Sequence, residues 1–199
     1  MKIYIDFDCI LFDTDKFYFE FLKICNKYGI SKEEIQILID KLFSKNSLFN
    51  LEKIVKELTK QYNLNKTFFD ECMSLFDNDF VYNDVIPNLE KLYKKYELIL
   101  LTYGDFDYQS KKIKSSNLKK YFNKIIITSS IKSEIENICY DEGVFIDNNP
   151  KEIERFINKS AKKVIRVRRP SDKYSKIDTK LTVSEYEDLS QLVDNELLN

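Results

Sequence analysis

Two aspartates, Asp6 and Asp8, follow a short apolar run near the start of the chain, in the order Ile3-Tyr4-Ile5-Asp6-Phe7-Asp8. Residues i and i+2 of a β-strand point to the same side, so both carboxylates would lie together at the carboxyl end of this strand. An ionised carboxylate is costly to bury unless it is paired or bound to a cation. The pair therefore indicates either a catalytic or metal site, or an Asp-rich turn that caps the next helix.

Three later apolar runs also end in polar residues, which are Thr102-Tyr103-Gly104, Lys132 and Asp147-Asn148. Taken singly, each has an ordinary interpretation as a capping hydroxyl, a solvated lysine or an Asx turn. Together they would bring two carboxylates, a hydroxyl, an ammonium group and a third carboxylate into one crevice. Carboxylates bind Mg²⁺, while hydroxyl, ammonium and free backbone N–H groups bind phosphate. The set predicts a phosphoryl-transfer site.

Five apolar, β-branched runs would have to position these residues. They cover 2–7, 97–102, 124–128, 143–147 and 163–167, and four of them lack alternation, as expected for buried parallel strands. Helical patterns at 105–116, 133–140 and 149–158 separate the last four, and the third of these opens with Asn149 as N-cap and Pro150 at N1. Strands that alternate with helices predict an α/β fold, a doubly wound parallel sheet with ligands at the carboxyl ends of its strands.

About 90 residues without a strand pattern separate the first two strands. The segments 14–28, 31–44, 47–62 and 65–78 are amphipathic, with a capping box at Ser31-Lys32-Glu33-Glu34 and Gly29 as a helix stop. A further helix is expected at 83–96 and a last one at 184–194. We therefore expect an α/β core formed by 1–14 and 84–199, with an all-helical insertion at 15–83.

Composition excludes several classes of site. The chain of 199 residues has no histidine, which excludes a Ser-His-Asp relay, and only three glycines, which excludes a Walker A loop. Its four cysteines are far apart, and its net charge is −1, so neither a zinc site nor nucleic-acid binding is favoured. The acidic start and the absence of a long apolar run predict a cytoplasmic protein that does not contact membranes. We expect it to be a monomer or a homodimer.

The stretch Asp6-Phe7-Asp8-Cys9-Ile10-Leu11-Phe12-Asp13-Thr14, with the three later motifs, resembles the haloacid dehalogenase (HAD) superfamily, which consists mostly of Mg²⁺-dependent phosphatases. The resemblance implies that Asp6 is a nucleophile that forms an aspartyl-phosphate and that Asp8 is the general acid and then the base. It implies that Thr102 and the backbone N–H groups of Tyr103 and Gly104 hold the phosphoryl oxygens. The helical insertion resembles the cap that closes over the crevice in that family.

The resemblance also implies that Lys132 neutralises charge on the phosphate, and that Asp147 binds Mg²⁺ with Asp6 and the backbone carbonyl of Asp8. The last motif departs from the family pattern, because its second position is the neutral Asn148. If that position faces the metal, affinity for Mg²⁺ should fall. Glu152 then stands at the family's downstream acidic position, or else completes a capping box with Asn149.

Cys9 replaces a glycine of the family motif, and is either a redox-sensitive thiol or a small packed residue. The basic stretch 162–176 either attracts a polyanion or forms a solvated edge. Among the aromatic residues of the first helix of the insertion, one or two could face substrate.

The function expected from the resemblance is hydrolysis of a small phosphorylated metabolite, such as a nucleoside monophosphate or a sugar phosphate, through phospho-Asp6. The alternative is a catalytically weak protein that binds a phosphorylated ligand or a partner, with a metal site weakened by Asn148. Phosphotransfer to an acceptor other than water would use the same site. Dehalogenation is disfavoured, because Asp8 and Asp147 serve phosphoryl chemistry.

Overall fold

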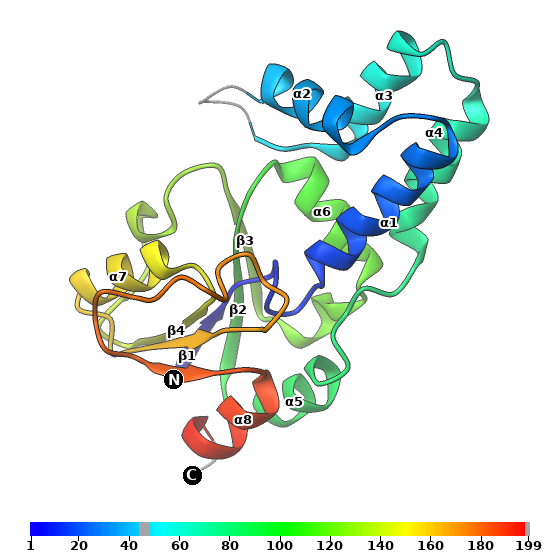
Figure 1. The fold of residues 1–199 in the computed structure, drawn as a ribbon. Helices are drawn as coiled ribbons and strands as arrows, with labels where there is room; N and C mark the ends of the chain where they lie inside the picture. Colours follow the sequence, from blue (N-terminus) through cyan, green and yellow to red (C-terminus); the bar gives the residue numbers. More distant parts are fainter. Residues whose placement is uncertain (44–47, 198–199) are drawn as a thin grey trace.

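The computed structural model describes residues 1–43 and 48–197, and is built on a six-stranded parallel sheet (Figure 1). The order across the sheet is β3-β2-β1-β4-β5-β6, so β1 lies in its interior. The strands are β1 (Lys2–Ile5), β2 (Glu97–Tyr103), β3 (Lys124–Thr128), β4 (Gly143–Asp147), β5 (Lys163–Val167) and β6 (Ser184–Tyr186). The predicted doubly wound α/β fold is confirmed.

Alternate residues of the strands supply two separate cores. Ile3 and Ile5 belong to the larger one, which includes side chains of α5 (Val85–Leu92), α6 (Phe106–Ser115) and α8 (Leu189–Leu192). Tyr4 faces the other side and stacks on Phe145 with ring centroids 4.5 Å apart. Phe156 of α7 (Pro150–Asn158) covers that side. Because both faces are covered, the central strands β1, β2 and β4 are mostly apolar.

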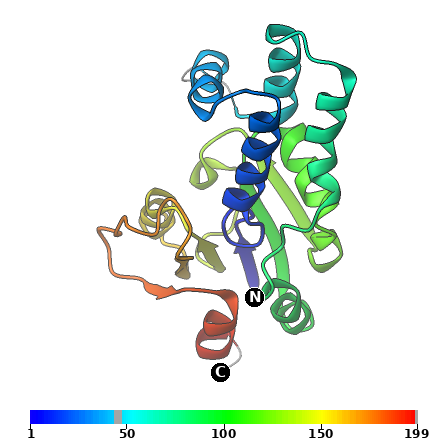
Figure 2. The same cartoon turned by 45° about the vertical axis from the view of Figure 1, so that its right-hand side comes forward.

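Four helices form an insertion between β1 and α5 in the sequence. They are α1 (Thr14–Lys27), α2 (Lys32–Leu42), α3 (Leu51–Gln61) and α4 (Lys66–Met73), followed by a 3₁₀ turn at Ser74–Asp77. They lie beyond the carboxyl ends of the central strands, whereas α8 and the N-terminus lie at the opposite end of the sheet (Figures 1 and 2). The insertion thus faces the edge where the motif residues were predicted.

Local signals set the helix ends correctly where a side chain caps the backbone. Ser31 accepts from Glu34 N while the Glu34 side chain accepts from Ser31 N, which completes the predicted capping box. Gly29 has φ of +75°, as a helix stop requires. Asn149 is the N-cap of α7, with Pro150 at its start. The predicted helix ends at Ser44 and Ser47 lie outside the described residues.

Two helix predictions are wrong. Segment 133–140 contains only a 3₁₀ turn at Lys132–Glu134, and Asn137 adopts φ of +64°. The segment packs instead as an irregular cover, with the ring of Tyr140 stacked on Phe145 at 5.5 Å. Segment 184–194 begins as strand β6, because its backbone pairs with β5, and only Leu189–Leu192 forms a short α-helix.

Within the described part of the chain, no helix is both long and apolar enough to cross a bilayer.

Candidate active site

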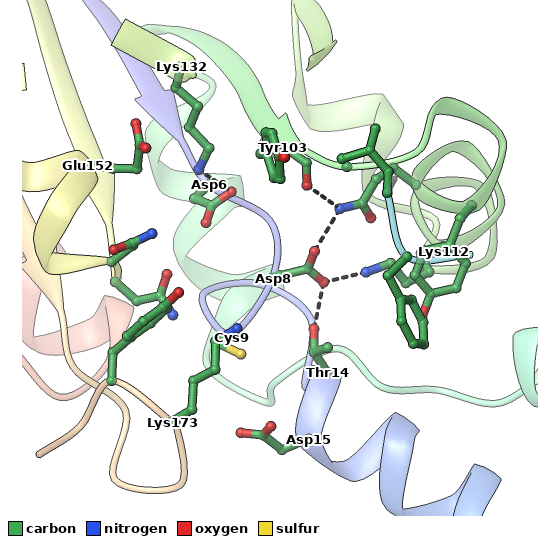
Figure 3. Close-up of a pocket in the computed structure, with 18 of the residues that line it drawn as sticks. Asp6, Asp8, Cys9, Thr14, Asp15, Tyr103, Lys112, Lys132, Glu152 and Lys173 are labelled. Carbon is green, nitrogen blue, oxygen red and sulfur yellow. Dashed lines mark hydrogen bonds and ion pairs between the residues drawn. The ribbon is translucent and has the colours of Figure 1, made fainter. Parts of the chain in front are cut away.

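A cavity of about 600 Å³ opens at the carboxyl ends of β1 and β2, between the sheet and the helical insertion. Its wall includes Asp6 and Asp8 from the segment after β1, Tyr103 and Gly104 from the end of β2, and Lys132 (Figure 3). The structure therefore brings together residues that the sequence predicted for one site. Parallel strands place their carboxyl ends at one edge of the sheet, which explains the convergence.

Lys132 bridges two buried carboxylates. Its Nζ lies 2.7 Å from Asp6 Oδ1 and 2.7 Å from Asp147 Oδ2, and the ammonium-bearing side chain is 4% exposed. The backbone N–H of Asp6 donates to Ile146 O at 2.9 Å, which fixes the end of β1 against β4. An ammonium group beside Asp6 would offset the repulsion that a bound phosphate meets from this carboxylate.

Burial is the largest influence on the pKa values of Asp6 and Lys132. It raises the pKa of Asp6, and the nearby Asp147 and Asp8 carboxylates raise it further, to about 7, although Lys132 opposes the shift. Burial alone would lower the pKa of Lys132, but Asp147 and Asp6 together raise it above its usual value. The ionised form of Asp6 is thus disfavoured mainly by its burial, which the contact with Lys132 only partly offsets.

Asp8 is held by three donors. Thr14 Oγ1 donates to Asp8 Oδ1 at 2.5 Å, Gln109 Nε2 donates to Oδ2 at 2.7 Å, and the Lys112 ammonium donates to Oδ1. Burial would raise the pKa of Asp8, but Lys112, Gln109 and Thr14 together hold it below its ordinary value. In this structure Asp8 is therefore an ionised carboxylate.

Lys112 is a functional candidate that the sequence analysis missed. Its side chain is 1% exposed, and its Nζ lies 4.8 Å from the ring centroid of Tyr108 and 5.3 Å from that of Phe12. A buried lysine is rare unless it is paired. It was one of 32 basic residues, and its position on one face of α6 with Gln109, three residues earlier, was the only available signal.

Thr102 lies deeper than predicted. It is 1% exposed and does not contribute to the cavity wall, and its hydroxyl accepts from Gln109 Nε2 at 3.2 Å. Tyr103 and Gly104 do line the cavity. Gly104 has φ of +156°, and a Cβ there would come within 2.8 Å of Gln109 Nε2, so a glycine is needed where the chain passes Gln109.

Asp147 and Asn148 have different surroundings. Asp147 is 1% exposed, and both its carboxylate oxygens are engaged, Oδ2 by Lys132 and Oδ1 by Asn149 N at 2.8 Å. Asn148 lines the cavity, whereas Asp147 does not contribute to its wall. The second position of the motif, and not the first, therefore faces the cavity.

Glu152 also lines the cavity. One of its carboxylate oxygens pairs with Arg155, and the other, Oε2, is buried without a hydrogen-bond partner. Burial, with Asp147 nearby, raises its pKa. The capping box with Asn149 does not form, because Glu152 turns away toward Arg155.

Cys9 is 4% exposed at φ of +58°. Burial and the adjacent carboxylates, Asp172 first, raise the pKa of its thiol, which suits a packed residue and not a reactive thiolate.

Much of the basic stretch 162–176 serves the fold. Arg166 is fully buried and donates to the carbonyls of Tyr174 and Ile177 at 2.8 and 2.7 Å. Arg169 donates to Ile10 O at 2.7 Å and to Asp84 at 3.0 Å. These guanidinium groups hold the loop after β5 against the site, so they are not a surface for a polyanion.

The donor set fits a hard divalent cation. The cavity wall carries four carboxylates and the amide of Asn148; the carboxylates are those of Asp6, Asp8, Asp15 and Glu152, and the cations beside them are Lys112, Lys132, Arg155 and Lys173. Burial first, with neighbouring carboxylates, holds the pKa of Asp6 above its usual value, and a bound cation would favour its ionised form. Carboxylate, amide and carbonyl oxygens are the ligands that Mg²⁺ takes. The Asp6 carboxylate, the backbone carbonyl of Asp8 and the Asn148 amide oxygen would hold it.

Solved structures with the same fold cover nearly the whole chain. A haloacid dehalogenase-like hydrolase from Burkholderia xenovorans matches with a TM-score of 0.77 at 15% identity, over 98% of this chain and 95% of its own. A HAD phosphatase from Thermococcus onnurineus matches at 0.66 and 21% identity, over 98% and 97%. A HAD hydrolase from Bacillus subtilis bound to magnesium matches at 0.65 and 13% identity, over 97% and 96%.

L-2-haloacid dehalogenase from Xanthobacter autotrophicus also shares the fold. No family model and no curated protein sequence matches the chain. The fold predicted from the motifs is thus confirmed as that of the HAD hydrolases, at identities that establish the fold alone.

Proposed function

We propose that this chain, which has the fold of the HAD hydrolases, is a Mg²⁺-dependent phosphatase that acts on a small phosphorylated metabolite through a phospho-aspartate at Asp6. The observation that carries the proposal is the pairing of Asp6 with Lys132 at 2.7 Å at the wall of the cavity. A carboxylate nucleophile needs no histidine to activate it, which suits a chain that has none.

In the first step, an Asp6 carboxylate oxygen attacks phosphorus, and the bond between phosphorus and the leaving oxygen breaks. Lys132, which contacts the other oxygen of Asp6, neutralises charge that builds on the phosphoryl group. Free backbone N–H groups around Tyr103 and Gly104 bind the phosphoryl oxygens. Mg²⁺, if held by Asp6, the carbonyl of Asp8 and Asn148, would supply further positive charge that stabilises the phosphoryl group.

Proton transfer passes through Asp8. Because Asp8 is ionised at rest, it acts as a relay: Lys112 Nζ gives a proton to Asp8 through their hydrogen bond, and Asp8 passes a proton to the leaving oxygen. In the second step water attacks phosphorus, the bond to Asp6 breaks to restore the carboxylate, and the proton of the water returns through Asp8 to Lys112. Each turnover then leaves the site in its starting protonation state.

The helical insertion acts as the cap. Tyr18 of α1, with Leu48 and Phe49 before α3, lines the cavity on the side away from the sheet. A cavity of about 600 Å³ covered in this way suits a small phosphomonoester and not a phosphoprotein.

A binding module with the same fold is the second candidate, and Asn148 is the observation that favours it, because a neutral ligand binds Mg²⁺ more weakly than a carboxylate. The hydrolase is preferred, since a module that only binds phosphate has no need of a buried carboxylate against the phosphoryl group. A dehalogenase would not require the donors that hold Asp8.

Phosphate release from a panel of phosphorylated metabolites tests the proposal, with Mg²⁺ and with EDTA, for the wild type and Asp6→Asn. We expect release that requires Mg²⁺ and disappears in the variant. Release that survives in Asp6→Asn would exclude the phospho-aspartate. If no substrate is hydrolysed while phosphorylated ligands still bind, the binding module is the correct function.

A further inference from the structure

Asn148 is joined to a carboxylate that none of the four motifs contains. Its Nδ2 donates to Asp172 Oδ2 at 2.7 Å, and the two side chains are 4% and 2% exposed. Asp172 lies in the loop between β5 and β6, 24 residues along the chain. An ionised carboxylate can only accept hydrogen bonds, so the amide nitrogen of Asn148, and not its oxygen, must face Asp172.

The surrounding contacts prevent either partner from turning. Asp172 Oδ1 accepts from Tyr174 N at 3.1 Å, so both carboxylate oxygens are engaged. The fully buried Arg166 donates to Asn148 O at 3.2 Å and to Tyr174 O at 2.8 Å. One guanidinium group therefore fixes the backbone on both sides of the pair.

We propose that Asp172 is a positioning residue that holds the Asn148 amide with its oxygen toward the Mg²⁺ site. Through the short hydrogen bond it also supplies the negative charge that the neutral Asn148 lacks. The negative charge expected at the second position of the motif thus lies on Asp172, which is one hydrogen bond away from Asn148. Outer partners of this kind orient and polarise metal ligands. The inference rests on the proposed Mg²⁺ site.

The hydrogen bond between Asn148 and Asp172 predicts that substitutions at the two positions depend on each other. Asn148→Asp alone would set two buried carboxylates against each other, where they repel and where one of them must take up a proton. It should therefore weaken Mg²⁺ binding, although it installs the carboxylate of the family motif. The exchange Asn148→Asp with Asp172→Asn restores one carboxylate and one amide, and should bind Mg²⁺ at least as tightly as the wild type.

The experiment measures the Kd for Mg²⁺ by titration calorimetry on the complete metal-free chain, for the wild type, both single variants and the exchange. We expect Asp172→Asn to weaken binding about 10–100-fold, as outer partners of metal ligands do. Asp188→Asn is the matched control, because Asp188 accepts from Gln191 N at the start of α8 and does not line the cavity. It should leave the Kd unchanged. Circular dichroism checks that each variant is folded.

Two results would overturn the inference: a wild-type Kd in Asp172→Asn, or tighter binding in Asn148→Asp than in the exchange. If the wild type releases phosphate with Mg²⁺ in either case, the proposed function stands without the inference. A wild type that neither binds Mg²⁺ nor releases phosphate removes both. Rescue of the Kd in the exchange is a result that a merely structural role of Asp172 would not give.

Discussion

At the scale of single residues, the site contains a buried cluster of charged side chains, and removing any one of them would destabilise the others. Lys132 is buried between Asp6 and Asp147, and neither carboxylate lies in bulk water. Such an arrangement is poor evidence for stability, because desolvation offsets the attraction, but removal of one member leaves the others uncompensated. The cluster is therefore better explained by what it does to a phosphate than by what it adds to the fold.

Lys132→Met tests that explanation. Loss of the ammonium group leaves two buried carboxylates without the cation that they share, so we expect the free energy of unfolding in EDTA to fall by about 3–5 kcal/mol. Phosphate release should fall by about 100-fold or more, since an electrostatic contact to the reacting group is lost. Urea unfolding and steady-state kinetics measure the two effects. A variant of normal activity would show that Lys132 is only structural.

The pKa of Asp6 predicts how the stability of the metal-free protein changes with pH. Burial and its acidic neighbours raise this pKa to about 7, against about 4 in the unfolded chain. The folded state therefore binds the extra proton between those values, and its stability falls as pH rises from about 4 through 7.

Urea unfolding in EDTA across this range should show that fall in the wild type and a smaller one in Asp6→Asn. Because the variant lacks the carboxyl group, the difference between the two curves isolates Asp6. Mg²⁺ should reduce the fall, since it favours the ionised form. A difference that does not change with pH would mean that Asp6 is ionised throughout.

At the scale of elements, α6 is the helix that supplies two of the hydrogen-bond donors to Asp8. It begins directly after β2, with Asp105 as its N-cap, and presents Gln109 and Lys112 on one face toward the end of β1. The two residues are three apart, which places them on neighbouring turns of the same face. The aromatic rings of Phe7, Phe12 and Tyr108 surround the lysine and keep it from solvent.

Lys112→Met tests whether this lysine takes part in the reaction. Methionine fills similar space among the three rings, but the Asp8 carboxylate loses its buried cation and keeps Thr14 and Gln109 as donors, so we expect the free energy of unfolding to fall by about 1–3 kcal/mol. Phosphate release should fall by about 10²-fold, a typical effect of losing a proton-transfer partner. Lys114→Met replaces an exposed lysine on the same helix and is the control; it should change neither phosphate release nor the free energy of unfolding. Equal activity in the two variants would refute a role for Lys112.

At the scale of the whole molecule, the insertion and the sheet meet where α3 and α6 begin. Asn50, the N-cap of α3, donates to Asp105 Oδ1 at 2.7 Å, and Lys53 lies 3.7 Å from the other oxygen of Asp105. The rings of Phe49 and Tyr108 lie 5.4 Å apart across the same junction. These contacts bring the insertion over the cavity, where it can shield the reaction from water.

The cap should therefore act on substrates by size. Tyr18→Ala and Phe49→Ala remove side chains by which the insertion lines the cavity. We expect KM for a bulky phosphomonoester to rise about tenfold, which corresponds to roughly 1.4 kcal/mol of lost contact. With acetyl phosphate, which is too small to reach these side chains, KM should change little. Equal effects on both substrates would argue against the cap.

The sequence by itself determined the α/β fold, five of the six strands and the positions of the motif residues. These follow from local signals, because a buried parallel strand is an apolar run and its carboxyl end lies at one edge of the sheet. The capping box at Ser31 and the N-cap at Asn149 are equally local. Strand β6 was not predicted, because its three residues show no apolar or alternating pattern and are a strand only through their pairing with β5.

Only the tertiary structure decided which polar residues complete the site. Gln109 and Lys112 lie 101 and 104 residues from Asp8, and Asp172 lies 24 residues from Asn148. In the sequence each is one polar residue among many, since a third of the chain is charged. Burial selects among them, because a charge enclosed in a protein persists only where the fold brings it a partner. That selection also decides that Asn148, and not Asp147, faces the cavity.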